Sequence, residues 1–578
     1  MLQIILTLAI FLVIAIPMGH YLYSIASYKK TFADGFFNRV DGAIYRLCWV
    51  DKDKGMNFKQ YTLSLIATNA IMVIIGYIIL KLQFLPILNP NGTGSMESTL
   101  SFNTVISFIT NTNLQHYAGE SGLSYFSQMT VIIYMMFMSS ATGYSVCVAF
   151  SRAITGAKND MGNFYVDLVR IITRVLLPLS IIVGLLLVLQ GVPQNFNANV
   201  TVHTLEGKFQ DIAMGPMAAL ESIKHIGTNG GGFLSGNSAT PLENPTVISN
   251  IIELISMMIL PASCVIMFGL MCYNRKKENT EVKAPSLKER KTIMGGEGRT
   301  VFIAMSILFV IGLAVCYRAE LAGNPALHNA GINQLAGNME GKEVRFGVAQ
   351  SALFTTTTTS FTTGSVNNMH DSLTPLGSLV AMLGMMLNCV FGGKGVGLMN
   401  MIMYAILGVF ICGLMIGRTP EYLSKKIEGK EMKLIVLSLI LHPLLILGFS
   451  AVAVSVNGGL DAITNSGFHG LSQVIYEYAS SAANNGSGFE GLKDNNAFWN
   501  ITTAVVMFFG RYLTITLQLA VAWSLLGKRR MNESSGTLKT DTIPFAIIMV
   551  FVVCIFAALT FLPALALGPV AEHLTLLG

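Results

Sequence analysis

Charged residues are scarce in this sequence. Only 12% of its 578 residues are Asp, Glu, Lys or Arg, against roughly a quarter in soluble domains, and 52% are hydrophobic. This composition excludes an ordinary soluble enzyme, and the mean hydropathy of +0.58 indicates a polytopic membrane protein. The net charge of +6 comes from basic loops between apolar runs, so we expect membrane lipid and no nucleic acid as a partner.

Motifs for nucleotide and metal chemistry are also missing. The sequence contains no G-x-x-x-x-G-K-[ST] loop, D-K-T-G motif, C-x-x-C pair or H-E-x-x-H motif. We therefore expect no bound nucleotide and no catalytic residue in this chain. The eight cysteines are scattered, mostly in apolar runs, and are expected to be packing residues. The histidines show no metal-ligand spacing, and His116, His225 and His370 are expected to form hydrogen bonds in loops.

Long apolar runs dominate what is present. A run of on the order of 20 residues crosses a bilayer, and the first one lacks a basic segment ahead of it, which favours a retained span over a signal peptide. Lys and Arg gather in alternate loops, which predicts that both termini lie on the outer face. Ten runs cover about 3–27, 62–84, 128–150, 172–192, 247–272, 300–317, 376–416, 432–455, 498–526 and 542–568.

Four of the outer loops repeat one pattern, in which a helix-like stretch precedes a turn of small polar residues and glycine. They read "TVISFITNTNLQ", "AALESIKHIGTNGGG", "ALFTTTTTSFTTGSVNN" and "VIYEYASSAANNGSG". Each lies between two spans, which predicts an all-α polytopic membrane protein with ten transmembrane helices and four span–pore-loop–span repeats around a pseudo-fourfold pore. The predicted units are a leading helix at 1–30, repeats at 60–152, 168–274, 298–418 and 430–528, and a trailing helix at 540–578.

The residue types in these loops suit the coordination of a potassium ion. Such an ion gives up its water shell only to rings of oxygens, chiefly backbone carbonyls from several loops. Glycine allows positive-φ conformations that aim carbonyls inward, and Thr and Asn add oxygens. Ordinary outer turns are the alternative, because Gly, Asn and Thr are common there, but four loops at equivalent places favour a pore.

The seventh apolar segment is too long for one crossing. Its length of about 43 residues would reach roughly 65 Å as a straight helix, against a hydrocarbon core of about 30 Å. We expect a break near the membrane centre, below the third loop, where a glycine loop is a candidate gate or a simple kink. This loop contains Gly392, Gly393, Lys394, Gly395 and Gly397.

A second intramembrane charge, Arg511, lies in the ninth span. An ionised side chain at that depth is costly unless it faces water or a partner. Arg511 is expected either to point beneath the four loops as an electrostatic barrier or to be a snorkelling or structurally paired arginine.

Several stretches resemble one known family, the potassium-binding, channel-like subunit of the bacterial Kdp potassium-transporting ATPase, within the Trk/Ktr/Kdp superfamily. The stretches are "SFITNTNLQHYAGE", "IGTNGGGF", "NSATPLENPT", "TTGSVNNMHDSLTPLG", "GLMIGRTPEYLSKKIEGKEMK" and "NNGSGF". The resemblance implies a K⁺ selectivity filter. Its predicted residues are Asn111, Thr112, Asn113, Thr228, Asn229, Gly230, Thr363, Gly364, Asn484, Asn485 and Gly486. Relatives often have cysteine where this chain has Thr363.

The same resemblance implies a function and partners. The chain would bind and select extracellular K⁺ and pass it to a catalytic P-type ATPase subunit for ATP-driven uptake across the bacterial inner membrane. A single-span accessory subunit and a small single-span stabilising subunit would complete the complex. A stand-alone Trk/Ktr-like K⁺ channel or secondary transporter is the alternative, because four filter loops fit both functions equally.

Two charged features of the loops are open to two interpretations. Glu221, Glu243, Glu477 and Glu490 flank the outer loops, where they either concentrate cations or form solvated surface. The basic stretch "NRKKENTEVKAPSLKERK" either meets anionic lipid headgroups or docks a cytoplasmic ATPase domain.

Overall fold

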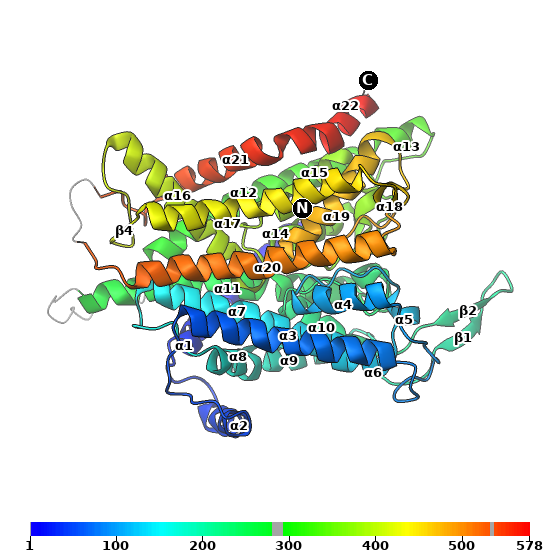
Figure 1. Ribbon diagram of the computed structural model, residues 1–578. Coiled ribbons are helices and arrows are strands. Elements are labelled where there is room, and N and C mark those ends of the chain that lie inside the picture. The colour runs from blue at the N-terminus through cyan, green and yellow to red at the C-terminus, as the bar shows by residue number, and fades with distance from the viewer. Residues whose placement is uncertain (1, 280–292, 532–536, 578) are drawn as a thin grey trace.

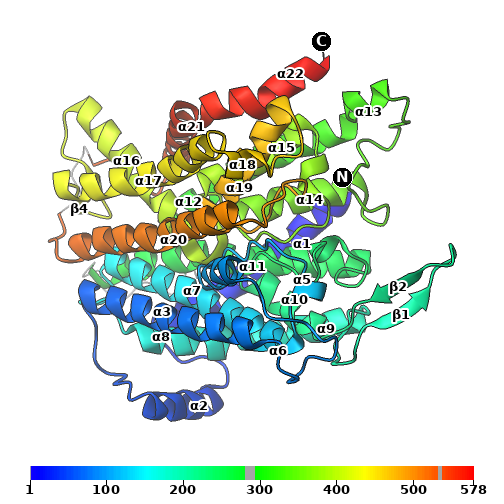
Figure 2. The same ribbon diagram turned by 45° about the vertical axis from the view of Figure 1, so that its right-hand side comes forward.

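A computed structural model describes residues 2–279, 293–531 and 537–577. Long helices run side by side along one direction of the molecule (Figure 1). Figure 2 shows both ends of the chain, together with the β1–β2 hairpin, toward the right-hand side, and β4 at the opposite end. Most of the predicted basic stretch lies at 280–292, outside the described residues.

Ten helical segments of the described residues are long and apolar enough to cross a membrane, which confirms the predicted number of spans. Three of them contain a short π-helical turn. The segments are built from α1 (Leu2–Ala26), α3 (Phe58–Leu82), α6 (Tyr125–Ser127) with η1 (Gln128–Ile133) and α7 (Tyr134–Thr155), α8 (Phe164–Ile171) with η2 (Ile172–Leu176) and α9 (Leu177–Leu189), α11 (Val247–Asn279), α12 (Gly296–Ala322), α16 (Val396–Ile416), α17 (Gly429–Ala453), α20 (Ala497–Leu526), and α21 (Ile543–Leu565) with η6 (Ala566–Val570) and α22 (Ala571–Leu577).

Four shorter helices lie between the two spans of a pair, at the places where the repeated loop pattern occurs. They are α4 (Ser98–Ile109), α10 (Met217–Ile226), α14 (Gly347–Ser360) and α19 (Gly467–Ala483). These helices are largely buried, so the protein interior surrounds them. Irregular backbone that follows such a helix is tolerated at membrane depth only when protein or water covers it.

The remaining elements are short connections. Cap residues in the sequence define several ends: Asn57 and Gln60 form a reciprocal capping box at the start of α3, and Gly156 ends α7 in the left-handed conformation. The other elements are α2 (Asp34–Leu47), α5 (Gly119–Gly122), η3 (Asn237–Ala239), α13 (Pro325–Asn329), η4 (His370–Ser372), α18 (Asn457–Leu460), and the antiparallel pairs β1 (Val200–His203) with β2 (Phe209–Ile212) and β3 (Glu421–Tyr422) with β4 (Lys425–Lys426).

The over-long seventh segment is broken, as its length predicted. Helix α15 (Pro375–Leu387) ends at Asn388, which has a φ of 44°, and α16 begins at Val396. The unwound stretch, with the short 3₁₀ turn η5 (Gly393–Gly395), therefore starts earlier than the predicted glycine loop. Gly397 was expected in the loop but lies in the first turn of α16, which begins at Val396.

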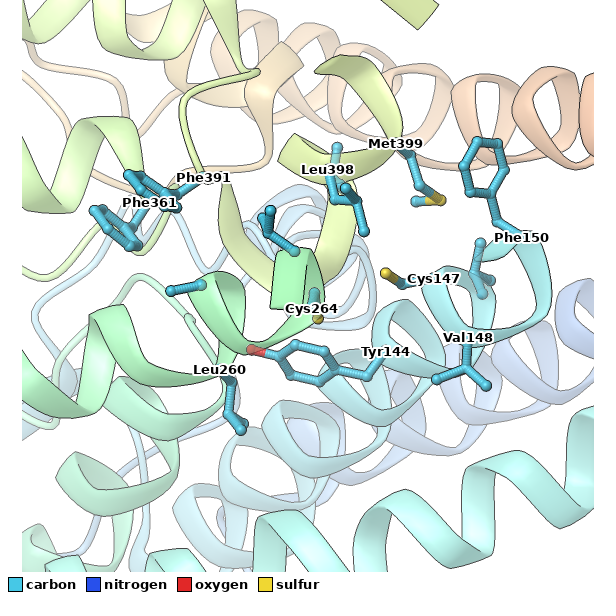
Figure 3. Close-up of a cluster of buried hydrophobic side chains, with 14 of the residues drawn as sticks. Tyr144, Cys147, Val148, Phe150, Leu260, Cys264, Phe361, Phe391, Leu398 and Met399 are labelled. Atoms are coloured by element: carbon cyan, nitrogen blue, oxygen red, sulfur yellow. The ribbon is translucent and has the colours of Figure 1, made fainter. Parts of the chain in front are cut away.

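Apolar side chains hold this broken helix against its neighbours. Figure 3 shows Cys147 of α7 and Cys264 of α11 beside Leu398 and Met399 of α16. The rings of Phe361, after α14, and Phe391, in the unwound stretch, stack with their centroids 4.7 Å apart. The loop is therefore packed into the core. Five of the eight cysteines are buried packing residues as predicted, whereas Cys412 is half-buried and Cys48 and Cys554 are exposed, so the prediction is wrong for these last two.

Two arginines near the ends of spans are buried. Arg152 pairs with Asp167 of α8, and Arg174 pairs with Asp41 of α2. The second pair attaches α2, which the hydropathy pattern did not predict as a separate helix, to η2. These buried ion pairs join neighbouring segments of the chain.

Candidate functional site

The four predicted loops share one backbone conformation at the ends of their short helices. The first residue of each loop has a left-handed φ between 50° and 64°. The amide of the second residue then donates to the carbonyl oxygen five residues earlier, at distances of 2.8–3.0 Å. The first residues are Asn111, Thr228, Thr362 and Asn484, and the four amide bonds run from Thr112 to Ser107, Asn229 to Lys224, Thr363 to Thr358, and Asn485 to Ser480.

This pattern aligns the loops residue by residue. It equates Asn111-Thr112-Asn113 with Thr228-Asn229-Gly230, Thr362-Thr363-Gly364 and Asn484-Asn485-Gly486. Thr362 was therefore missed by the sequence reasoning, although the shared "TTG", "TNG" and "NNG" triplets were a usable signal. A left-handed conformation is strained for a β-branched residue, so Thr228 and Thr362 adopt it only because the surrounding structure holds them there.

All eleven predicted residues are buried, and the loops meet one another. The side-chain amide of Asn111 donates to the Thr228 carbonyl oxygen at 2.7 Å, which joins the first loop to the second. The side-chain amide of Asn484 donates to the Thr112 hydroxyl oxygen at 2.9 Å, which joins the fourth loop to the first. The side-chain amide of Asn485 donates to the carbonyl oxygen of Thr358, in the last turn of α14, at 2.9 Å.

Gly230 lies where three loops approach one another closely. A Cβ atom placed on it would lie 2.5 Å from the Thr112 carbonyl oxygen and 2.7 Å from that of Asn485. Its φ is not positive, however; among the glycines of the second loop, the positive φ, 58°, belongs to Gly231. The expectation of a positive φ at Gly230 is therefore wrong, and Gly230 is needed for close approach.

Side chains behind the loops hold them in place, and these were not predicted from the sequence. The hydroxyl groups of Ser139 and Ser140, on α7, donate to the Asn111 side-chain oxygen at 2.9 and 2.8 Å. The Gln115 side chain accepts from the Gly232 amide at 2.8 Å and donates to its carbonyl oxygen at 3.1 Å. Serine and glutamine are common in loops and helices, so nothing in their spacing revealed this role.

The unwound stretch before α16 lies directly against these loops. The amide of Lys394 donates to the Thr228 hydroxyl oxygen at 2.9 Å. Its ammonium group donates to the carbonyl oxygens of Asn484, at 2.6 Å, and Asn111, at 3.2 Å. The Gly392 amide donates to the Ser360 carbonyl oxygen at 3.0 Å. The stretch thus touches the first residues of the first, second and fourth loops and the end of α14, just before the third loop, below which it was expected.

Arg511 lies beside Lys394 in the same buried region. Its guanidinium donates to the Ser139 carbonyl oxygen at 3.1 Å, while Nη1 has no hydrogen-bond partner among the described residues. A Cβ atom on Gly143 would lie 2.7 Å from both Arg511 Nη2 and Lys394 Cβ, so the two basic side chains converge there. Neither forms an ion pair with a described carboxylate, and the region below the loops is therefore electropositive.

A small cavity of about 30 Å³, lined by both polar and apolar side chains, adjoins this region on the side of α16, α17 and α20. It is large enough for a water molecule. Its polar lining consists of Asn388, Asn400, Tyr404, Ser438, His442, Asn484, Arg511 and Thr514.

Residues 5–574 match the family model described as the potassium-transporting ATPase A subunit. This chain belongs to that family. It is 54% identical over 575 residues to the "potassium-transporting ATPase potassium-binding subunit" of Clostridium acetobutylicum, with 100% of both chains covered. It is 53% identical to that of Geobacillus kaustophilus, with 99% of each covered, and 50% identical to that of Staphylococcus haemolyticus, with 99% of this chain and 100% of the other covered.

A solved structure gives a weaker likeness. The potassium transporter TrkH from Vibrio parahaemolyticus is 14% identical, with a TM-score of 0.49, and the match covers 78% of this chain and 83% of that one.

Most of the glutamates that flank the loops are not solvated surface residues, which was one of the two interpretations of the sequence. Glu221, Glu243 and Glu477 are buried, and only Glu490 is exposed. Glu243 accepts the amides of Phe233 and Leu234, which follow the second loop. These carboxylates are therefore built into the loops, and three of the four cannot be surface charges.

The three histidines form hydrogen bonds as predicted, but His225 lies in α10 and not in a loop. His225 Nε2 lies 2.9 Å from the Ser365 hydroxyl oxygen, next to the third loop, and His370 Nδ1 lies 2.6 Å from the Tyr476 hydroxyl oxygen. His116 contacts Asn500 and Glu477. Burial, with the nearby Lys342 charge, lowers the pKa of His370 to about 3, so this histidine is a neutral structural residue.

Proposed function

We propose that this chain is the potassium-binding subunit of a K⁺-transporting ATPase, and that the four loops form its selectivity filter. The proposal is supported most strongly by the conformation that all four loops share, which presents oxygens of several loops to one narrow, buried point. Such a point suits a small dehydrated cation better than a larger solute. The family to which the chain belongs carries the name of this activity.

The second part of the proposal concerns the path below the filter. Lys394 and Arg511 place two positive charges beneath the loops, where they oppose the direct passage of K⁺ to the cytoplasm. We infer that the ion leaves through the adjoining cavity, past its polar side chains, toward a catalytic P-type ATPase subunit, which hydrolyses the ATP. A single-span accessory subunit and a small single-span stabilising subunit are the further proposed partners.

The predicted division into repeats, the outer position of both termini and the bacterial inner membrane as location belong to the same proposal. A stand-alone K⁺ channel or secondary transporter remains the second candidate function. The shared conformation of the loops suits either candidate, and family membership favours the ATPase.

The test is to purify the tagged chain from membranes that contain its natural neighbours. We expect an ATPase to co-elute, with hydrolysis stimulated by K⁺. The Gly364→Ala variant places a Cβ atom against the Asn485 carbonyl and should abolish the K⁺ stimulation. Gly417→Ala is the matched control, because Gly417 also has a positive φ but has no neighbouring atom within 4 Å of its added Cβ.

Two results would contradict the proposal. K⁺ flux through liposomes that contain only this chain, with no co-eluting ATPase, would favour the stand-alone transporter. Equal K⁺ stimulation in Gly364→Ala and Gly417→Ala would remove the third loop from the filter.

A further inference from the structure

A cluster of three potential metal ligands lies beside the first and fourth loops. His116 follows the first loop by three residues, Glu477 is on α19, and Asp494 precedes α20. His116 Nε2 lies 3.2 Å from Glu477 Oε1 and 3.8 Å from Asp494 Oδ2, and the three ligand atoms lie within 4.8 Å of one another. No spacing in the sequence reveals this group, because His116 is 361 residues away from Glu477 along the chain.

The histidine is oriented as a metal ligand requires. Its Nδ1 lies 2.7 Å from the Asn500 side-chain oxygen, and the Asn500 amide donates to the Thr99 hydroxyl oxygen at 3.1 Å. The Asn500 oxygen therefore accepts a hydrogen bond from Nδ1–H. In the neutral ring the Nε2 lone pair then faces the two carboxylates, which is the usual arrangement of a metal-binding histidine with its supporting carbonyl group.

Apart from the His116 ring, no described group balances the negative charge of the cluster. Glu477 is 1% exposed, and its Oε2 atom has no hydrogen-bond partner. No described lysine or arginine forms an ion pair with Glu477 or Asp494. A second buried group, Glu221, His225 and Glu253, differs because the Lys224 ammonium lies 2.5 Å from Glu221. In that group a lysine already supplies the positive charge.

We propose that His116, Glu477 and Asp494 bind a divalent transition-metal ion of the Zn²⁺ type. Zinc bonds of about 2.1 Å place the ligand atoms of a tetrahedron roughly 3.4 Å apart, which is close to the observed separations. One nitrogen and two carboxylates leave a fourth position for water. The Asp494 side chain is 23% exposed, and it provides the route from solvent.

Potassium is a poorer occupant of this site than Zn²⁺. An imidazole nitrogen is a favoured ligand of zinc, copper, iron and nickel, whereas hard cations take oxygen ligands. Glu477 is close to the fourth loop, since a Cβ atom on Gly488 would lie 3.7 Å from its Oε2. A bound metal would therefore connect the segment that follows the first loop with α19, the helix that precedes the fourth loop.

The test measures metal binding by the full chain, purified without a polyhistidine tag and placed in lipid nanodiscs. We expect equilibrium competition with a chromophoric chelator to detect Zn²⁺ bound by the wild type, and Co²⁺ to give the intense visible bands of a tetrahedral site. His116→Gln should weaken Zn²⁺ binding at least about tenfold and abolish those bands. Asn500→Leu keeps all three ligands but removes the supporting oxygen, and it should weaken binding by about 10- to 100-fold.

His469→Gln is the matched control. His469 also contacts two carboxylates, but Nδ1 faces Glu572 at 2.9 Å and Nε2 faces Asp371 at 2.8 Å. The two carboxylates lie on opposite sides of the ring, so one ion cannot bind all three groups, and the variant should bind Zn²⁺ as the wild type does. Equal Zn²⁺ affinity in the wild type and both His116→Gln and Asn500→Leu would overturn the proposal. A wild type that gives no tetrahedral Co²⁺ bands would do the same.

Discussion

Single residues in the loops have different tasks, although their sequence positions look equivalent. Gly364 and Gly486 have positive φ values of 92° and 104°, whereas Gly230 does not. The equivalent residue of the first loop, Asn113, has a φ of 61° without being glycine. Glycine content alone therefore identifies neither the backbone conformation nor the point of closest approach.

The first prediction concerns Gly230. Replacement by Ala or Asp adds atoms that overlap the carbonyl oxygens of Thr112 and Asn485, and Asp also adds a negative charge. We expect both variants to lose at least about tenfold in apparent K⁺ affinity, which corresponds to about 1.4 kcal/mol, and to discriminate less against rubidium and ammonium. Cation-stimulated ATPase activity of the assembled complex, titrated with each cation in turn, measures both effects.

The control for this prediction is Gly184→Ala in α9. Its added Cβ would meet Ser222 at an ordinary contact distance of 3.6 Å, so the apparent affinity and cation ranking should stay unchanged. A Gly230 variant with the wild-type affinity and ranking would make Gly230 a turn residue and remove the second loop from the filter.

Among the elements, the break between α15 and α16 is the most consequential for the proposed path. It allows a lysine on the seventh apolar segment to reach the carbonyl oxygens of two different loops. An unbroken helix would carry Lys394 on its side and could not present the ammonium group beneath the loops. The element thus converts a costly intramembrane charge into a hydrogen-bonded one.

The second prediction tests this break through Lys394→Met, which keeps most of the side-chain volume and removes the charge. If the ammonium group obstructs the path, its loss should permit K⁺ or rubidium flux without ATP. A reduction of the barrier by about 1.4 kcal/mol would raise the rate about tenfold. Flux into proteoliposomes that contain the assembled complex, with and without ATP, is the measurement.

Lys433→Met is its matched control, because Lys433 is an exposed residue of α17. Flux and coupling in this variant should equal those of the wild type. If Lys394→Met also keeps tight coupling to ATP, the unwound stretch is a kink without a gating role.

The third prediction concerns the attachment of α22 to α19 through His469. Burial lowers the pKa of His469, but its hydrogen bonds to Asp371 and Glu572 outweigh burial and raise the pKa to about 10. Because the pKa is raised in the folded state, the stabilisation is complete below the ordinary value of about 6.5 and is lost as the pH rises through about 10.

His469→Gln should therefore lower the unfolding temperature most at about pH 6, through a loss of about 1–2 kcal/mol, and have little effect above about pH 10. Thermal unfolding of the detergent-solubilised chain across this pH range is the measurement. His328→Gln, at an exposed histidine of α13, serves as the control and should have little effect at any pH. A pH-independent difference between wild type and His469→Gln would show that the histidine acts by packing and not by charge.

At the scale of the whole molecule, the ten spans surround loops from four separate parts of the chain. The hydrogen bonds that close the site join Asn111 to Thr228 and Asn484 to Thr112. The site therefore depends on the packing of the complete chain and not on any one pair of spans.

The fourth prediction belongs to this scale. The chain has no phosphate-binding or phosphorylation motif, so the isolated chain should not hydrolyse ATP, whereas the assembled complex should do so in a K⁺-dependent manner. Phosphate release from the purified chain, compared with the complex at equal concentration, is the measurement. ATP turnover by the chain alone, free of other subunits, would contradict the proposed division of labour.

Hydropathy and loop composition determined much of this protein by themselves. The number of spans, the break in the seventh segment and the four loops follow from local sequence, because a bilayer sets the length of an apolar helix and irregular backbone needs small polar residues. The family motifs identified eleven residues of the candidate site. Alignment of the four triplets would also have found Thr362.

Only the tertiary structure decided which groups from distant segments meet. It placed Lys394 against Asn111 and Asn484, Ser139 and Ser140 behind the first loop, and His116 beside Glu477 and Asp494. It also showed that Gly230 is required for space and Gly231 for its positive φ. Contacts between residues on different elements of the chain arise from helix packing, which leaves no periodic signal in the chain, so the sequence alone could not reveal them.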